Sequence, residues 1–179
     1  MDHRSGFATM AALGLALLPS TLLAQQPQQP PSRQQKPAKE LILGSWALLL
    51  IDGVKEDGTH VPLYGPNPEG MFIVGPEGHF SINVMRSGRA PFASNNRLAG
   101  TDAENRATVQ GSFAYFGRYM LDDGGKTINL HIEASAFPNF EGANQKRDIT
   151  AITDEILTFN FEPAEPGYTH GEAVWKKLK

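Results

Sequence analysis

The amino-acid sequence predicts an all-β domain, an eight-stranded up-and-down antiparallel β-barrel with one short helix inserted before the fourth strand. Three observations predict this fold. Short apolar runs of strand length alternate with turns rich in Gly, Asp, Asn and Pro. Several runs alternate apolar and polar residues with a period of two, as strands do when one face is buried. Most consecutive runs are joined by tight turns, and closing such a meander into a barrel removes its exposed edges.

Each predicted element has a local signal. The strand patterns occupy residues 42–51, 70–74, 79–86, 113–121, 126–133, 145–152, 156–161 and 171–178. Turn sequences of the hairpin type lie at 75–78 (GPEG), 122–125 (DDGG) and 153–155 (TDE). The segment 101–111 predicts a helix instead, because it begins with a Thr-Asp cap and acidic first-turn residues and ends at Gly111. This helix could cover one end of the barrel.

The alternation within the strands leaves one question open. In the strand at 126–133, Ile128, Leu130 and Ile132 share one face, and His131 and Glu133 share the other. Alternation alone does not say which face lines the barrel. If the apolar face lines it, His131 and Glu133 are solvent-exposed groups; if the polar face lines it, they are candidate site residues.

The N-terminal part of the chain predicts export. Residues 1–24 show the layout of a signal peptide, with Arg4 ahead of an apolar run at 7–18 and small Ala24 at the expected cleavage site. An uncleaved anchor is the alternative. Residues 25–39 are rich in Pro and Gln and predict a disordered tether, because they offer almost no apolar surface to bury. The barrel domain is then 40–179, and the expected location is periplasmic or secreted.

Composition narrows the function. The formal net charge is −3, which argues against a nucleic-acid partner. The chain has no cysteine, so disulfides and thiol nucleophiles are excluded. The five histidines are widely separated and show no metal-binding spacing, so we expect no metal and no cofactor. We also expect no stable membrane insertion of the mature domain, and the sequence does not indicate an oligomeric state.

The first strand carries a familiar motif, Gly44-Ser45-Trp46. Further segments accompany it at 64–70 (YGPNPEG), 85–92 (MRSGRAPF), 114–119 (AYFGRY) and 131–139 (HIEASAFPN), with a closing Trp175. Together they resemble the lipocalin-like domain family of bacterial and fungal proteins. The resemblance implies a calycin-type barrel with a helix inserted before the fourth strand. It also implies that Gly44 permits close approach of the chain and that Trp46 plugs the closed end of the barrel.

The resemblance bears on function as well. It implies no established activity for the family, although some fungal relatives are tied to natural-product pathways, where ring-closing or isomerising roles have been suggested. In true lipocalins an Arg near the end of the last strand packs over the Trp. Lys176 and Lys177 hold that place here.

The strongest candidate site residues lie on two neighbouring strands of the predicted sheet. His131, Glu133 and Ser135 would share a strand face, and Gln145 and Arg147 would share one on the next strand. A His beside a carboxylate and an Arg could move a proton or hold an anion; the alternatives are a structural hydrogen-bond network and a solvated outer face. The full set of ligand-binding candidates is Arg86, Tyr115, Tyr119, His131, Ser135, Asn139, Gln145 and Arg147, with Gly44, Trp46 and Trp175 as structural residues.

Two hypotheses about function follow. The first is an exported module that binds a small, partly apolar ligand with a polar or anionic end inside the barrel. The alternative is a cofactor-independent isomerase or cyclase that uses the same cavity, with His131 and Glu133 as its acid–base pair. A third possibility is an interaction or stress protein whose barrel is packed by its own side chains. The direction in which His131, Glu133 and Arg147 point separates these possibilities.

Overall fold

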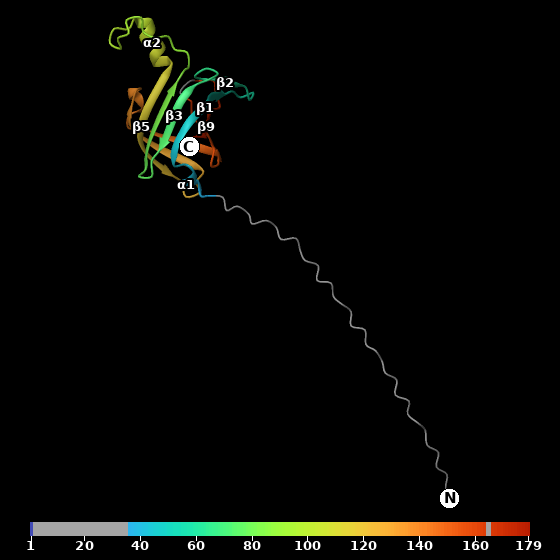
Figure 1. Ribbon diagram of the computed structural model, residues 1–179. Coiled ribbons are helices and arrows are strands. Elements are labelled where there is room, and N and C mark those ends of the chain that lie inside the picture. Colours follow the sequence, from blue (N-terminus) through green and yellow to red (C-terminus); the bar gives the residue numbers. More distant parts are fainter. Residues whose placement is uncertain (2–35, 164–165) are drawn as a thin grey trace. The chain divides into compact units, whose positions relative to one another are not determined.

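A computed structural model describes residue 1 and residues 36–163 and 166–179, and within these ranges the chain forms a closed antiparallel barrel (Figure 1). Strand β1 pairs with β3 on one side and with β9 on the other, which closes the sheet. The eight barrel strands are β1 (Gly44–Val54), β3 (Glu69–Val74), β4 (His79–Met85), β5 (Ser112–Leu121), β6 (Thr127–Ser135), β7 (Asn144–Ile152), β8 (Ile156–Phe161) and β9 (His170–Lys177). The predicted fold class is therefore confirmed.

A ninth short strand, β2 (His60–Pro62), pairs with the end of β1, beyond the part of β1 that pairs with β3. The sequence does not predict it, because three residues are too few to show alternation. Two further short elements are α1 (Ala38–Leu41) and the 3₁₀ turn η1 (Pro138–Phe140). The first of these begins within residues 25–39, which the sequence predicts to be a tether. The predicted signal peptide, apart from residue 1, and residues 25–35 lie outside the described residues.

The apolar face of the strands lines the barrel. In β6, Ile128, Leu130 and Ile132 are each no more than 1% exposed, while His131 and Glu133 on the alternate face are exposed. The same period of two runs through β4. Burying these aliphatic and aromatic side chains supplies the main driving force for closing the sheet.

The predicted helix is confirmed as α2 (Asp102–Gln110), which directly precedes β5, the fourth strand of the barrel. Thr101 caps it: the Glu104 amide donates to the Thr101 hydroxyl oxygen at 3.3 Å, and the Thr101 amide donates to the Glu104 carboxylate at 2.7 Å. The Ala93 amide also donates to that carboxylate, at 2.7 Å. The hydrogen bonds that this carboxylate accepts from Ala93 and Thr101, that from Ala93 most of all, lower the pKa of Glu104. One acidic side chain thus fixes both the helix start and the loop before it.

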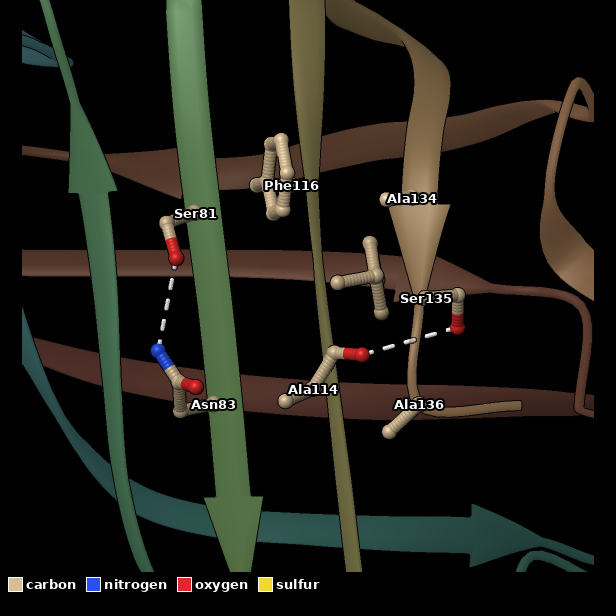
Figure 2. Close-up of a pocket in the computed structure, with 8 residues that line it drawn as sticks. Ser81, Asn83, Ala114, Phe116, Ala134, Ser135 and Ala136 are labelled. Carbon is tan, nitrogen blue, oxygen red and sulfur yellow. Dashed lines mark hydrogen bonds between the residues drawn. The ribbon is translucent and has the colours of Figure 1, made fainter. Parts of the chain in front are cut away.

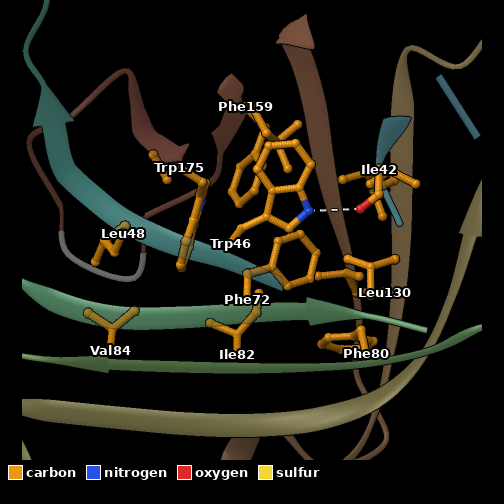
Figure 3. Packing of buried hydrophobic residues seen from close by; sticks show 14 of the residues in the cluster. Ile42, Trp46, Leu48, Phe72, Phe80, Ile82, Val84, Leu130, Phe159 and Trp175 are labelled. Atoms are coloured by element: carbon orange, nitrogen blue, oxygen red, sulfur yellow. Dashed lines mark hydrogen bonds between the residues drawn. The ribbon is translucent and has the colours of Figure 1, made fainter. Parts of the chain in front are cut away.

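Trp46 lies fully buried near the start of β1, at the α1 end of the barrel. Its indole N–H donates to the Ile42 carbonyl oxygen at 2.8 Å (Figure 3). The Lys177 amine lies 4.6 Å from the centre of the Trp46 ring and donates to the Leu41 carbonyl oxygen at 2.6 Å. Gly44 has a φ of +116°, and a Cβ there would meet the Lys177 side chain at 3.4 Å. Lys177 therefore covers the tryptophan and ties α1 to the barrel, and its partial burial lowers the pKa of its amine.

Candidate functional site

The barrel interior is filled largely by its own side chains. Trp46, Phe72 and Trp175 are each at most 1% exposed, and the Phe72 ring packs 5.7 Å from the Trp175 ring, centre to centre (Figure 3). A small pocket of about 30 Å³ remains, roughly the space of one water molecule. Its walls are Ile51, Ile82, Phe113, Tyr115, Arg147, Phe159, Phe161, Ala173 and Trp175.

Arg147 supplies the charge of this pocket. It is only 7% exposed, and it is the one buried charged side chain in residues 36–163 and 166–179. Its guanidinium donates to the Tyr115 hydroxyl oxygen at 2.9 Å, to the Gln145 amide oxygen at 2.5 Å and to the Lys146 carbonyl oxygen at 2.9 Å. All three acceptors are neutral, and Arg147 forms no ion pair with a described carboxylate.

Aromatic rings enclose the guanidinium. Its central carbon lies 5.4 Å from the centre of the Phe161 ring and 5.9 Å from that of Phe159. Cation–π attraction of this kind is worth about 0.5–2 kcal/mol, more when the pair is desolvated. The two rings therefore offset part of the cost of burying a cation, but they provide no counter-charge.

Another residue of the pocket wall, Trp175, has a buried donor without a described acceptor. Trp175 is 1% exposed and lines the pocket. Its indole nitrogen is buried, and no acceptor for it is found among the described residues. An unpaired buried donor is costly, by about 1–3 kcal/mol. The pocket thus has a guanidinium and a tyrosine hydroxyl within otherwise apolar walls, and Trp175, one of the residues that form these walls, has a buried indole N–H without a described acceptor.

A chain of aromatic rings closes the end of the barrel opposite Trp46. Tyr64 packs on Phe113 at 5.3 Å between ring centres, and Phe113 stacks on Tyr115 at 5.6 Å. Tyr115 in turn meets Phe140 at 6.2 Å, and Phe140 meets Phe137 at 5.1 Å. Phe113 lies near the start of β5, whereas Phe140 and Tyr64 lie in connections between strands. Two of these rings, Phe113 and Tyr115, also line the pocket.

The proposed acid–base pair does not reach the interior. The His131 ring lies 3.0 Å from the Asn144 amide oxygen, and the Glu133 carboxylate pairs with Arg118 at 3.0 Å. All four side chains are exposed on the outer wall. Because Leu130 and Ile132 occupy the inward positions of β6, the period of two forces His131 and Glu133 outward. The expectation that they could act inside the cavity is wrong.

The structure brings some of the remaining candidate residues together and places the others elsewhere. Tyr115, Gln145 and Arg147 come together inside the barrel, as described above. Tyr119 is half-buried nearer the α1 end, where its hydroxyl donates to the Gly75 carbonyl oxygen at 2.9 Å and burial raises its pKa. Arg86 is exposed and donates to the Leu63 carbonyl oxygen at 3.1 Å. Ser135 lies at an outer hollow, and Asn139 is exposed in η1.

That outer hollow is larger than the interior pocket, at about 310 Å³, and opens on the outside of β4, β5 and β6 (Figure 2). Its polar side chains are engaged locally: the Asn83 amide donates to the Ser81 hydroxyl oxygen at 3.3 Å, and the Ser135 hydroxyl donates to the Ala114 carbonyl oxygen at 3.5 Å. No charged side chain lines it. The interior pocket is therefore the better candidate, because it holds a buried charge and an unpaired donor.

Several pocket residues were not predicted as site residues. The sequence predicts a structural role only for Trp175 and does not mark Phe159, Phe161 or Ala173. These residues occupy the alternate positions of β8 and β9 whose side chains point into the barrel. The sequence identifies those positions only once the apolar face is known to line the barrel.

Among the described residues, no three His, Asp or Glu side chains gather to hold a metal ion. The described helices are all too short or too polar to cross a membrane.

Comparison with known proteins gives a curated relative and several designed barrels. The 4′-hydroxy-3′-methoxypropiophenone carrier protein ppsC of Aspergillus oryzae is 34% identical over 83 residues, which cover 43% of this chain and 74% of the relative. A designed fluorescence-activating β-barrel covers 80% of this chain and 100% of its own, at 11% identity and a TM-score of 0.41. A redesigned barrel covers 79% and 96%, at 11% identity and the same TM-score of 0.41.

The strand pairing described above establishes the fold. The family assignment has independent support from sequence. The family model for the lipocalin-like domain matches residues 43–178, nearly the whole of the barrel. The chain belongs to the lipocalin-like domain family.

Proposed function

We propose that this protein is an exported carrier that binds a small, partly apolar ligand inside the barrel, with the polar or anionic end of the ligand at Arg147. The observation that carries the proposal is the burial of Arg147 without a carboxylate partner. A buried charge is normally paired, because its desolvation is expensive. A ligand oxygen would supply the missing partner.

The curated relative supports this kind of function. Its name describes a carrier of a substituted propiophenone, a small aromatic ketone with a phenol hydroxyl. Such a molecule has an apolar ring and oxygen acceptors at its ends. The aligned part covers less than half of this chain. The relative therefore supports a carrier of small molecules and does not identify the ligand here.

The size of the pocket sets a condition on binding. Pockets that enclose drug-sized ligands usually measure about 300–1,000 Å³, whereas this pocket measures about 30 Å³. A ligand must therefore displace side chains as it enters. The aromatic rings at the end opposite Trp46 are the movable part, because Phe113 and Phe140 are only partly buried. We propose that this end of the barrel is the ligand entrance.

The proposed location is the periplasm or the exterior of the cell, reached through cleavage of the signal peptide after Ala24. The support is the charge, apolar run and small residues at positions 1–24. N-terminal sequencing of the protein recovered from fractionated cells tests this. A mature protein that begins at Gln25 outside the cytoplasm agrees with export, and a cytoplasmic protein that retains Arg4 contradicts it.

Thermal unfolding against a panel of small lipophilic compounds tests the carrier function. A ligand that binds only the folded state raises the midpoint temperature. Ala173→Leu adds bulk within the pocket and should abolish the shift. Ala134→Leu adds the same bulk at the outer hollow and should leave it intact. The proposal fails if no compound shifts the wild-type midpoint, or if Ala134→Leu removes the shift and Ala173→Leu does not.

A further inference from the structure

We infer that the ligand class is a planar aromatic ring that carries an ionised oxygen directly, such as a phenolate or an aryl carboxylate. This inference rests on the proposed carrier function and makes it specific. The charge on the ligand, the acceptor character of its polar end and its flat shape each follow from separate observations in the pocket.

The first observation is the uncompensated charge. An arginine side chain is a permanent cation in proteins. Its present acceptors, which belong to Tyr115, Gln145 and the Lys146 backbone, are all neutral. A neutral acceptor satisfies hydrogen bonds but cancels no charge, and a charge-assisted hydrogen bond is roughly twice as strong as a neutral one. The pocket therefore favours an anion over a neutral ligand of equal shape.

The second observation is an excess of donors. The three hydrogen bonds described above use three of the five N–H donors of Arg147. The Tyr115 hydroxyl accepts from Arg147 and keeps its own proton to donate. The Trp175 indole N–H has no acceptor among the described residues. The polar groups on the pocket wall thus donate, which selects a ligand end that only accepts, as an oxyanion does.

The third observation is the shape of the walls. Phe113 and Tyr115 stack nearly parallel, with 15° between their planes. Phe159 and Trp175 are inclined by only 31°, at 6.2 Å between ring centres. Flat walls of this kind suit a flat ring, and aromatic pairs gain about 0.5–1.5 kcal/mol beyond the burial of their area. Because Arg147 lies against Phe159 and Phe161, the oxyanion must be attached close to the ring.

The probes for the experiment are 4-nitrophenol and its methyl ether, 4-nitroanisole. The first is a small aromatic ring whose ionised oxygen absorbs visible light, and the second is a neutral compound of nearly the same shape. We expect the wild-type protein to bind 4-nitrophenolate at least about tenfold more tightly than 4-nitroanisole. We also expect the pKa of bound 4-nitrophenol to fall, so that the bound probe stays ionised at pH values where the free probe is protonated.

Variants test whether Arg147 causes the preference for the anionic probe. Arg147→Met keeps a long apolar side chain and should remove the preference for the anion, while Arg147→Lys should retain part of it. Lys146→Met is the matched control, because it removes one positive charge from the adjacent exposed position. That variant should behave like the wild type. Near-ultraviolet circular dichroism checks that each variant is folded, and the pKa of the bound probe tests the wild type even if Arg147→Met does not fold.

The outcomes separate this inference from the carrier function. Equal affinity of the wild type for both probes, or an anion preference that survives Arg147→Met, overturns the inference and leaves the carrier function in place. The same holds if neither probe binds while other compounds of the lipophilic panel do. If nothing in the panel binds, the carrier function itself fails. An anion preference that Arg147→Met removes and Lys146→Met keeps supports the inference.

Discussion

Arg147 and Tyr115 meet across the inside of the barrel, with the guanidinium donating to the tyrosine hydroxyl oxygen at 2.9 Å. They lie on β7 and β5, which do not pair with each other because β6 lies between them. The hydrogen bond therefore passes over β6 on the inner face of the sheet. It holds the guanidinium at the pocket and places the Tyr115 ring in the row of aromatic side chains that closes the barrel.

Removing the Tyr115 hydroxyl should destabilise the fold through Arg147. We expect Tyr115→Phe to lower the free energy of unfolding by about 1–3 kcal/mol, because a buried charged donor loses an acceptor. The effect should disappear in an Arg147→Met background. Urea unfolding of the single and double variants measures the coupling.

Tyr119→Phe is the matched control, because the Tyr119 hydroxyl donates to the Gly75 carbonyl and not to Arg147. Its effect should add to that of Arg147→Met. If the losses of unfolding free energy from Tyr115→Phe and Arg147→Met also add in the double variant, the two side chains are not coupled. The hydrogen bond between them would then contribute nothing to stability.

Lys177 should be replaceable by Arg but not by Met. Lys177→Met keeps an apolar stem over Trp46 but leaves the Leu41 carbonyl oxygen without its donor. We expect it to lose about 1 kcal/mol of unfolding free energy. Lys177→Arg can stack on the indole and still donate, so it should lose less than half as much. Thermal unfolding of the two variants decides this, and equal losses would contradict the assigned role.

Glu104 should make the loop before α2 sensitive to acid. Hydrogen bonds from Ala93 and Thr101 depress the pKa of this carboxyl in the folded state, relative to an ordinary value of 4.5. A depressed folded pKa gives stability that is present above the unfolded pKa and lost as pH falls through the folded pKa. Hydrogen exchange at the amides of residues 93 and 101 should therefore show strong protection at neutral pH and weaker protection in acid.

Glu104→Gln should remove that pH dependence and lower the neutral-pH protection to the level that the wild type reaches in acid. Glu155→Gln, at an exposed position outside this loop, should change neither amide. Unchanged protection in Glu104→Gln would show that the carboxylate does not hold the loop.

Gly117 should not tolerate a side chain. It lies at the register shift between β5 and β6, where an added Cβ would overlap the His131 carbonyl oxygen. Overpacking against backbone typically costs about 1–3 kcal/mol, and this clash is close enough for Gly117→Ala to reach or exceed that range. Gly124→Ala is the control, since its Cβ would meet only ordinary contacts at 3.6 Å and beyond. Chemical unfolding should show a large loss for the first variant and a small one for the second.

The barrel could be predicted because its signals are local. Turn residues at 75–78 and 122–125 mark the hairpins, and alternation in β4 and β6 marks the strands. The helix α2 carries its own cap at Thr101. By contrast, β2 gave no signal, because a strand of three residues depends on pairing with β1 rather than on any pattern of its own.

The site could be predicted only in part. The sequence predicts Tyr115, Gln145 and Arg147 as candidates, but it also predicts His131 and Glu133, which point outward. The alternation of side chains along a strand shows which residues share a face, but it does not show which face lines the barrel. The contact of Arg147 with Tyr115, and the place of Trp175 in the same pocket, depend on closure of the sheet, which no local pattern encodes.

The two tryptophans of the chain allow the most direct test of ligand binding inside the barrel. The Trp46 indole N–H already donates to the Ile42 carbonyl oxygen, whereas the Trp175 indole N–H has no described acceptor. Nitrogen–proton NMR of the two indole groups, assigned with Trp46→Phe and Trp175→Phe, follows both during a titration with a ligand from the thermal panel. The Trp175 signal should shift downfield as its proton gains an acceptor, and the Trp46 signal should stay. A ligand that binds while the Trp175 signal does not move would contradict a site at Arg147 and Trp175.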